Sequence, residues 1–445
     1  MRKYLARLVV GSAVLLTASS MNAASVQSAI ASKKLPLSAL RAMKARTARS
    51  SDAISKFATT KPGISKFTAT TGTPGVDSLV NWSDQFTAPG FDGAGNPQSV
   101  WPYTMVGTPP ESGISTTIKS PIVPVVVDLL GPDGKVAVFN GQALSFGPGR
   151  DVVHDVVGSP IYQPYIYTSG VGQLNDQMMR TQFWDRIGHG SGHGDEFENG
   201  WHVFLSPRAR TTRRMEVPFN SWVFFVDANN NPVLFALDAD TFSSLFFPVV
   251  VDNSTTIGAA ELAGDITTRD MSTFLFKDIV LYVGNPNNCC IIGFHTYDFE
   301  PGDKKNGNRE RRYVLNYSSW LSPGLFLFGF QDITPWSHEL AETFDDPFVN
   351  NATPWWLSVD NFFGSGNCQN NLETGDVVEV LDSQVPTYSI ATNGRTYHPQ
   401  NEAIFPWFAF QSPSRAHLGA YSFPDETTLP ALSPANLLPG CVPAP

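Results

Sequence analysis

One stretch of the chain, Gln331-Asp-Ile-Thr-Pro-Trp-Ser-His-Glu-Leu-Ala-Glu-Thr-Phe-Asp-Asp-Pro347, combines the signals of a short helix with side chains suited to chemistry. Thr334 followed by Pro335 is a favourable helix start, because threonine can cap free N–H groups and proline suits the first helical position. Pro347 ends the helix, because proline cannot continue the helical hydrogen-bond pattern. The stretch therefore predicts a short helix that follows an apolar strand at Leu325–Phe330.

The predicted helix has an apolar and a polar face. Every fourth position carries a large apolar residue that would be buried: Trp336, Leu340 and Phe344. His338 and Glu342 are also four residues apart, so both project from one face, and Glu339 directly follows His338. We therefore expect an imidazole and a carboxyl group to face the same space, one helical turn apart.

This spacing is typical of metallohydrolase helices. In the usual H-E-x-x-H form, both histidines hold zinc and the glutamate is the general base. Here Glu342 replaces the second histidine, and a carboxylate is an acceptable zinc ligand. The sequence therefore predicts a metal site with His338 and Glu342 as ligands and Glu339 as the catalytic base. Because an anionic ligand reduces the Lewis acidity of the metal, we expect weaker catalysis than with two imidazoles.

A catalytic zinc site has three protein ligands and one open position, so a third ligand is expected elsewhere in the chain. Glu373 and Asp376, in the segment Glu373-Thr-Gly-Asp376, are the main candidates. The other candidates for this position are Asp345, Asp346, His295 and His398.

Zinc is the expected ion and another divalent metal is the alternative. Calcium is disfavoured, because histidine is a poor ligand for a hard cation. The competing interpretation is an amphipathic helix whose polar face carries acids and no metal.

The region around this motif, residues 280–410, resembles two sets of exported proteins. Four short motifs are similar to the signature of secreted bacterial zincin-like proteins with an H-E-x-x-E helix: Ser337-His-Glu-Leu-Ala-Glu342, Asp346-Pro347, Trp355-Trp356 and Glu373-Thr-Gly-Asp376. The pattern is also distantly similar to the plant EXORDIUM/phosphate-induced family. The resemblance implies export and a zincin-like site that uses His338 and Glu342, and it implies no substrate. The chain departs from the plant members in having no cysteine directly after Asp376, where Val377-Val378-Glu379 stands instead.

The amino-terminal residues predict export. Residues 1–23 have the pattern of a secretory signal peptide: basic residues, an apolar run too short to span a bilayer, and small residues. Residues 24–75 carry nine lysines and arginines but one acid, Asp52, and show no apolar periodicity. This composition predicts a flexible basic leader or a removable pro-segment. We therefore expect a secreted protein, extracellular or periplasmic, with no membrane span.

The composition of the whole chain excludes several functional classes. The chain has 30 basic and 40 acidic residues, a formal net charge of −10, so the basic face of a nucleic-acid-binding protein is not expected. The 42% of hydrophobic residues is enough to bury a large core, which excludes general disorder. The metal motif instead predicts a peptide or protein substrate as the partner, with the oligomeric state left open.

Residues 76–445 are expected to form one large, strand-rich α+β domain that contains the zincin-like helix. Two hairpins are predicted, one from Trp222–Val226 and Val233–Leu237, and one at the turn Asn393-Gly394. A further helix is expected at Leu174–Trp184. Other strands are expected at Ile122–Leu130, Leu245–Val251, Phe274–Val283, Ile291–Tyr297 and Tyr313–Tyr317.

Four cysteines are disulfide candidates in an exported protein: Cys289, Cys290, Cys368 and Cys441. Four cysteines allow three pairings, and the pairing that joins the neighbours Cys289 and Cys290 requires a strained bond. The two favoured schemes tie this pair to Cys368 and Cys441, which would staple the last third of the chain.

Two functional hypotheses account for these patterns. The first is a secreted metal-dependent hydrolase, with a zinc metallopeptidase as the first choice and Glu339 as the general base. The second is a non-catalytic extracellular binding or cell-surface protein that retains a zincin-like scaffold, with a structural metal or none. The carboxylate of Glu342, in place of the usual histidine, gives the second hypothesis its weight.

Overall fold

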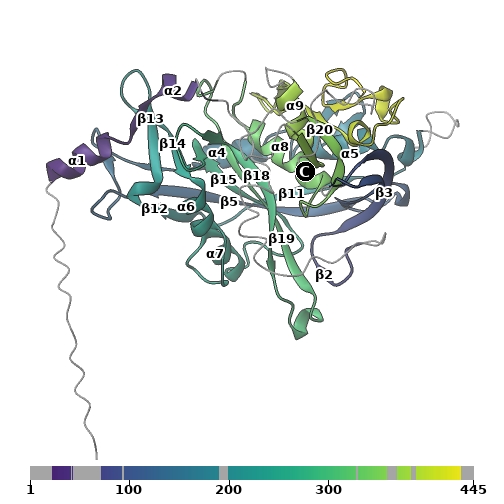
Figure 1. Ribbon diagram of the computed structural model, residues 1–445, viewed down its shortest axis with the longest axis horizontal. Helices are drawn as coiled ribbons and strands as arrows, with labels where there is room; N and C mark the ends of the chain where they lie inside the picture. Colours follow the sequence, from purple (N-terminus) through teal and green to yellow (C-terminus); the bar gives the residue numbers. More distant parts are fainter. Residues whose placement is uncertain are drawn as a thin grey trace, which may run out of the picture.

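Apolar side chains alternate along the longest strand, β5 (Thr116–Leu129), and this alternation separates two cores. Ile118 and Ile122 pack into the first apolar cluster, whereas Val123 and Val125 pack into the second. β5 runs through the middle of the body (Figure 1). The computed structural model describes residues 23–41, 43, 72–92, 95–189, 199–326, 329–357, 368–381 and 387–431.

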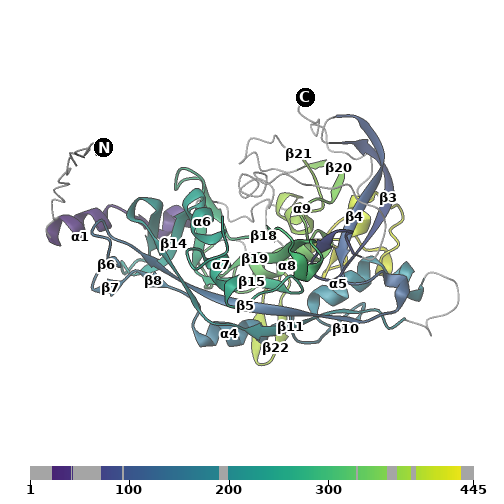
Figure 2. The same cartoon turned by 90° about the horizontal axis from the view of Figure 1, so that it is seen from below.

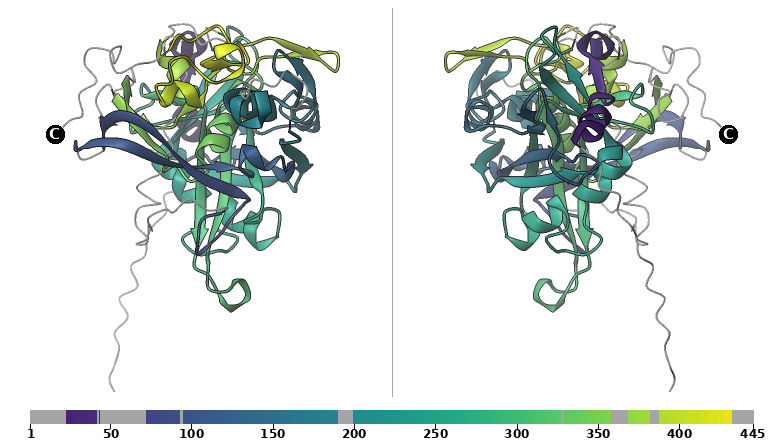
Figure 3. Two further views of the ribbon diagram at one scale, coloured as in Figure 1. Left: turned by 90° about the vertical axis from the view of Figure 1, so that its right-hand side faces the viewer. Right: turned by 90° about the vertical axis from the view of Figure 1, so that its left-hand side faces the viewer.

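β5 belongs to a mixed sheet whose main path is β11-β5-β15-β19-β18. The strands of this path, besides β5, are β11 (Val203–Ala209), β15 (Met271–Lys277), β18 (Gly293–Glu300) and β19 (Glu310–Trp320). Three short strands join β5 or β19: β2 (Val76–Asp77), β8 (Ser145–Phe146) and β12 (Arg213–Val217). β18 and β19 form an antiparallel hairpin whose tip projects beyond the body (Figure 3). His295 on β18 lies opposite Asn316 on β19.

A second sheet has the order β1-β13-β14-β16-β17. Its strands are β1 (Lys34–Pro36), β13 (Trp222–Val226), β14 (Pro232–Asp238), β16 (Ile279–Tyr282) and β17 (Cys289–Ile291). One of its faces shares the second cluster with the large sheet, and its other face forms a third cluster.

Helices cover both faces of the large sheet. On the side of the second cluster lie α6 (Ala239–Phe246) and α7 (Thr256–Leu262), and on the side of the first lie α5 (Leu174–Gln182) and α8 (Thr334–Asp345). Figure 2 shows α8 and α5 beside one another on the body. α9 (Thr374–Leu381) packs next to α8. The architecture is a single α+β domain, as predicted.

The remaining elements are short and surround the two sheets. The helices are α4 (Arg150–Val157), α10 (Phe405–Phe408) and five one-turn elements at Pro110–Ser112, Asp185–His189, Phe219–Ser221, Lys304–Asn306 and His417–Gly419. The paired strands are β3 (Asn81–Phe91) with β4 (Pro97–Val106), β6 (Val138–Phe139) with β7 (Gln142–Ala143), β9 (Tyr165–Tyr167) with β10 (Gly170–Gly172), β20 (Ala352–Leu357) with β21 (Cys368–Asn371), β22 (Ile390–Thr392) with β23 (Arg395–Tyr397), and β24 (Glu402–Ala403) with β25 (Ser422–Phe423).

The first part of the basic leader departs from the predicted flexibility. Residues 23–41 form α1 (Ala23–Ala31), β1 and α2 (Leu37–Arg41). β1 pairs in parallel with β13, and the side chains of Ile30 and Leu40 are buried in the second and third clusters. The composition of residues 24–75 does not show that these few apolar side chains pack against distant parts of the chain. Residues 44–71 and the expected signal peptide, up to residue 22, lie outside the described part of the chain.

Several predicted elements are confirmed. β13 and β14 form the first hairpin, β22 and β23 form the second around Asn393-Gly394, and α5 occupies the predicted helix. Asn393 and Gly394 have φ angles of 52° and 75°, the left-handed values that this turn requires. Among the described residues, none of the helices has the length and apolarity needed to cross a membrane.

Two strand predictions are wrong and a third is correct only in part, each because of a local backbone feature. Phe274–Val283 is divided between β15 and β16, in different sheets, because Asp278 has a φ of 54° and accepts hydrogen bonds from Ser322. The start of Leu245–Val251 instead ends α6, which Asp238 caps through the backbone N–H of Thr241. The described residues of Leu325–Phe330 form no strand, and Gly329 has a φ of 89°.

Candidate metal centre

α8 begins one residue before the predicted start at Pro335, and it ends before Pro347 as predicted. Thr334 is its first residue, and the Thr334 hydroxyl donates to the Gln331 carbonyl at 2.7 Å. Pro335 follows within the first turn, and the backbone N–H of Asp346 closes the last turn on the Glu342 carbonyl at 2.6 Å. The N-cap residue is Ile333, which makes no side-chain cap, so Thr334 is the first helical residue and not the predicted N-cap.

The predicted apolar stripe of α8 is buried, and so is its polar face. Trp336, Leu340 and Phe344 lie in the first apolar cluster. The side chains of His338 and Glu342 are nevertheless 0% exposed, because β18, β19 and α9 cover the second face of the helix. The ionisable groups of α8 are therefore enclosed by protein, which is costly unless they are compensated.

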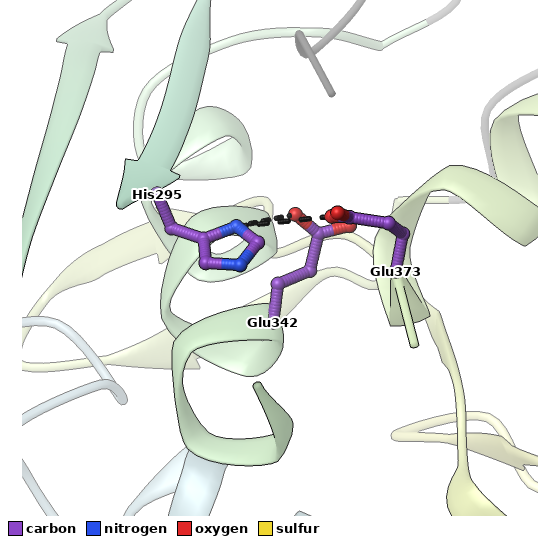
Figure 4. A group of neighbouring side chains, drawn as sticks. All are labelled: His295, Glu342 and Glu373. Atoms are coloured by element: carbon purple, nitrogen blue, oxygen red, sulfur yellow. Dashed lines mark hydrogen bonds and ion pairs between the residues drawn. The ribbon is translucent and has the colours of Figure 1, made fainter. Parts of the chain in front are cut away.

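Glu342 is the centre of the buried groups. Its Oε2 lies 3.0 Å from Nδ1 of His295, and its Oε1 lies 3.0 Å from Nε2 of His338. The carboxylate thus lies between two imidazoles, one from α8 and one from β18. Figure 4 shows His295 and Glu373 approaching Glu342 from a strand and from the start of α9.

Three further carboxylates surround these groups. Nδ1 of His295 lies 3.7 Å from Oε2 of Glu339 and 3.8 Å from Oε2 of Glu373. Nε2 of His338 lies 3.7 Å from Oδ1 of Asp376. We call these six residues the α8 cluster: His295, His338, Glu339, Glu342, Glu373 and Asp376. The first five are 0% exposed and Asp376 is 7% exposed.

Two glycines make this close approach possible. A Cβ on Gly293 would lie 2.4 Å from Oε1 of Glu339, and a Cβ on Gly375 would lie 2.3 Å from Nδ1 of His338. The backbone N–H of Gly375 also donates to Oε1 of Glu342 at 3.2 Å. Any side chain at either glycine would displace a member of the α8 cluster.

Amides hold the two carboxylates at the start of α9. The side-chain N–H of Asn371 donates to Oε1 of Glu373 at 2.6 Å, and that of Gln369 donates to Oδ2 of Asp376 at 2.9 Å. Both amides come from β21, which precedes α9. These bonds orient the carboxylates and leave one oxygen of each facing the imidazoles.

Burial and neighbouring charges shift the pKa values of these groups. Burial raises the pKa of Glu339 to about 8 and raises that of Glu373 well above its ordinary value. Burial also disfavours charge on Glu342, but the imidazoles of His338 and His295 outweigh it and lower its pKa. The pKa of His295 is raised well above its ordinary value, because the carboxylates of Glu373, Glu339 and Glu342 outweigh burial.

The donor set fits a metal ion. Two triples, His295–Glu342–Glu373 and His338–Glu339–Glu342, have ligand atoms within 4.8 Å of one another. Both oxygens of Glu339 are buried and accept no hydrogen bond from the described part of the chain. Buried polar atoms are normally paired, so such a carboxylate beside imidazoles needs a partner such as a cation. These buried groups could therefore hold a metal ion, and imidazole with carboxylate suits several divalent metals.

The structure brings together the four ligands named from the sequence, His338, Glu342, Glu373 and Asp376, and places the expected base Glu339 beside them. His295, one of the secondary candidates, lies within the cluster as well. The sequence could place His295 in a strand, but only the pairing of β18 with β19 directs its side chain toward α8.

The other secondary candidates lie outside the cluster. Oδ1 of Asp345 accepts a hydrogen bond from the Gln182 side chain at 2.6 Å, and burial raises the pKa of Asp345 to about 7. Asp346 accepts from the backbone N–H groups of Asn350 and Asn351. Nδ1 of His398 pairs with Asp332 at 2.6 Å, before the start of α8.

Gln182 connects α8 to an open cavity. Its Oε1 accepts from the backbone N–H of Phe405 at 3.0 Å while its Nε2 donates to Asp345. The same residue lines a cavity of about 770 Å³ together with Tyr103, Arg186 and Phe405. The cavity thus lies one side chain away from the last residue of α8.

The disulfide differs from the favoured schemes. Cys289 and Cys290 bond to each other, so the prediction that they pair with Cys368 and Cys441 is wrong. Cys289 and Cys290 are adjacent on β17 and are buried in the third cluster, among apolar residues such as Ile292 and Leu321. Because both thiols are enclosed together, each has the other as a partner within reach. Cys441 lies outside the described residues.

Comparisons with known proteins assign neither a family nor a function to the chain. No protein family, no curated protein and no solved structure matches this chain. Its function is therefore inferred from the geometry of the α8 cluster.

Proposed function

We propose that the protein is a metal-dependent hydrolase, with a peptide or protein as its substrate class. The observation that carries this proposal is the position of Glu342, between the imidazoles of His295 and His338, with the buried carboxylate of Glu339 at its side. When bound, zinc or another divalent cation supplies the Lewis acidity that polarises a carbonyl and acidifies water. His338, Glu342 and a donor from His295, Glu373 or Asp376 would hold this cation.

Glu339 is the residue that we assign as general base. It directly follows His338 on α8, and the absence of a side chain at Gly293 leaves space for its carboxylate. Burial raises its pKa to about 8, and a base is most effective when its pKa lies near the working pH. In hydrolysis, Glu339 would accept the proton of the attacking water and then deliver it to the leaving amine.

Two variants and one control test this proposal. Glu339→Gln should retain the metal and lose about 100-fold or more in the hydrolysis of an unfolded protein substrate. His338→Ala should lose hydrolysis and bind less metal than the wild type. Glu300→Gln, at a carboxylate on the same β18 strand but outside the cluster, should change neither. A wild-type protein that binds no metal under any loading condition would overturn the proposal.

The second candidate function is a non-catalytic binding protein with a structural metal. It is favoured by one observation: His338, Glu339, Glu342 and Glu373 are all 0% exposed, whereas a substrate must reach the reacting atoms. In this case, metal binding would persist, no peptide in a diverse library would be cleaved, and metal removal would lower the melting temperature.

Export is part of the same proposal. The residues before 24 would be removed as a signal peptide, and the packing of the ordered segment 23–41 supports its retention in the exported protein. Loss of β1 and α2 would uncover the third cluster, where Leu40 is fully buried. Mass spectrometry of the exported protein should therefore find an amino terminus near Ala24, and a terminus beyond residue 41 would show that the segment is a removed pro-segment.

A further inference from the structure

The two oxygens of Glu342 face different imidazoles. Oε2 lies 3.0 Å from Nδ1 of His295, and Oε1 lies 3.0 Å from Nε2 of His338. A single ion bound by both histidines would need the two imidazoles on the same side of the carboxylate. A carboxylate with a nitrogen donor at each oxygen is instead arranged as a bridge, as in hydrolases that hold two metal ions about 3.5–4 Å apart.

The remaining carboxylates divide in the same way. Glu339 and Glu373 approach Nδ1 of His295 to 3.7 and 3.8 Å. Asp376 instead approaches Nε2 of His338, to 3.7 Å. The cluster thus separates into two donor groups joined by Glu342, with Glu339 within reach of both because its carboxylate also lies near His338.

The number of carboxylates also favours two ions. The α8 cluster contains four carboxyl groups and two imidazoles, nearly all of them fully buried. Once the carboxyl groups are deprotonated as ligands, one divalent cation would compensate two of the four negative charges, and two divalent cations would compensate all four. Since uncompensated buried charge is strongly unfavourable, the donor set matches a pair of dications better than one.

Glu339 provides an independent observation. Its carboxylate is 0% exposed, and both oxygens accept no hydrogen bond from the described residues, although they point into the cluster. A native protein seldom leaves two acceptor oxygens buried in this state without an ion or water nearby.

We propose that the α8 cluster holds two divalent cations bridged by Glu342, one bound by His295 and Glu373 and the other by His338 and Asp376. The role of the pair in hydrolysis rests on the function proposed above, whereas the number of ions does not. Mixed imidazole and carboxylate donors suit zinc and manganese, so either ion serves as a probe.

The first test is the metal content of the full chain. The protein is loaded with Zn²⁺ or Mn²⁺, freed of excess ion by gel filtration and analysed by mass spectrometry of the elements. Two ions per chain are expected. One ion per chain would overturn the two-ion inference and leave the hydrolase proposal standing, and no ion would overturn both.

The second test asks where the ions bind. His295→Ala and His338→Ala should each retain one ion, because each substitution removes the nitrogen donor of one group. Glu342→Gln should weaken both sites. His417→Ala is the matched control, since His417 pairs with Glu426 outside the cluster, and it should retain two ions. A loss of both ions in only one histidine variant, with no change in the other, would overturn the division of the donors.

The third test examines the bridge, and its decisive measurement is made on the wild type. In the Mn²⁺-loaded wild type, two ions joined by a carboxylate should be magnetically coupled, so the six-line electron paramagnetic resonance spectrum of isolated Mn²⁺ should be largely absent. The single-ion histidine variants should show the six-line spectrum. Two ions per chain with an uncoupled spectrum in the wild type would overturn the bridging role of Glu342, whatever the folding of the variants.

Discussion

The strand β18 carries residues of two acidic clusters that differ in their surroundings. The α8 cluster includes His295 of β18 and combines two imidazoles with four carboxylates, almost completely buried. Three to five residues further along β18, Asp298 and Glu300 meet Glu261 of α7, with ligand atoms within 4.8 Å of one another. We call this second group, Glu261, Asp298 and Glu300, the tip cluster. Glu261 and Glu300 are partly exposed, and no nitrogen donor belongs to the group.

Proximity of acids alone does not make a metal site. In the tip cluster, Glu261 and Glu300 keep part of their surface exposed, so nearby solvent weakens the repulsion between the like charges. In the α8 cluster, water is excluded, and the same arrangement requires protonation or a cation. Nitrogen donors also give the α8 cluster an affinity for transition metals that an oxygen-only group lacks. Burial and mixed donors are therefore the features that separate the two.

The largest effect expected from this contrast is on metal affinity. Glu342→Gln should weaken metal binding about 100-fold or more, because even residues that only support a ligand contribute 10- to 100-fold. Glu300→Gln should leave the affinity unchanged, because it alters only the tip cluster. Isothermal titration with Zn²⁺ measures both. Equal losses in the two variants would show that the clusters are not distinct.

The next effect is on the pH dependence of stability. Burial raises the pKa of Asp345 to about 7 and that of Asp346 to about 6, so the metal-free folded protein holds protons that the unfolded chain releases near pH 4. The free energy of unfolding of the metal-free protein should therefore fall as the pH rises from about 4 through about 7. Glu342 acts in the opposite sense, but its stabilisation is lost only below its ordinary pKa, outside this window. Asp345→Asn should reduce the slope.

Metal should reverse this trend. Ligands bind a cation only when they are deprotonated, so binding strengthens with pH. The difference in melting temperature between metal-loaded and metal-free protein should grow from about pH 5 to about pH 8. Calorimetry with and without a chelator measures this difference. A difference that shrinks over the same range would contradict the assignment of these carboxylates as ligands.

The α8 cluster shows how much of a site local sequence can predict. The start of α8 at Thr334-Pro335 and the i, i+4 spacing of His338 and Glu342 are properties of neighbouring residues, and both are present in the structure. The segment Glu373-Thr-Gly-Asp376 could be named from its residue types, but the position of α9 beside α8 is a property of the tertiary fold.

Features that depend on contacts between distant segments could not be predicted. Strand alternation does not say which face of β18 meets α8, so His295 could be named only as one of several candidates. The close packing of Gly293 and Gly375 against the cluster depends on side chains 46 and 37 residues away, Glu339 and His338. The polar face of α8 was also compatible with a solvent-exposed helix, and only the covering strands and α9 show it to be buried.

A smaller effect is expected where α8 meets Gln182. Gln182→Leu removes the donor to Asp345 and the acceptor of the Phe405 N–H while keeping a similar volume. Each buried group left unpaired costs about 1–3 kcal/mol, so the free energy of unfolding should fall by about 2 kcal/mol or more. Chemical denaturation measures the loss. The metal content should be unchanged, because Gln182 touches no member of the α8 cluster within the described structure; a loss of metal would place Asp345 among the ligands.

The smallest effect is expected in the tip cluster. Glu300→Gln removes one of three neighbouring negative charges and keeps the shape of the side chain, so the protein should become more stable by about 0.2–0.5 kcal/mol. The gain should decrease at high salt, because partly exposed charges are screened. Chemical denaturation at low and high salt measures both changes. If the tip cluster held a cation of its own, the same substitution would instead lower stability, and added Ca²⁺ would stabilise the wild type more than the variant. That outcome would remove the contrast with the α8 cluster, because a partly exposed group without a nitrogen donor would then bind a metal as well.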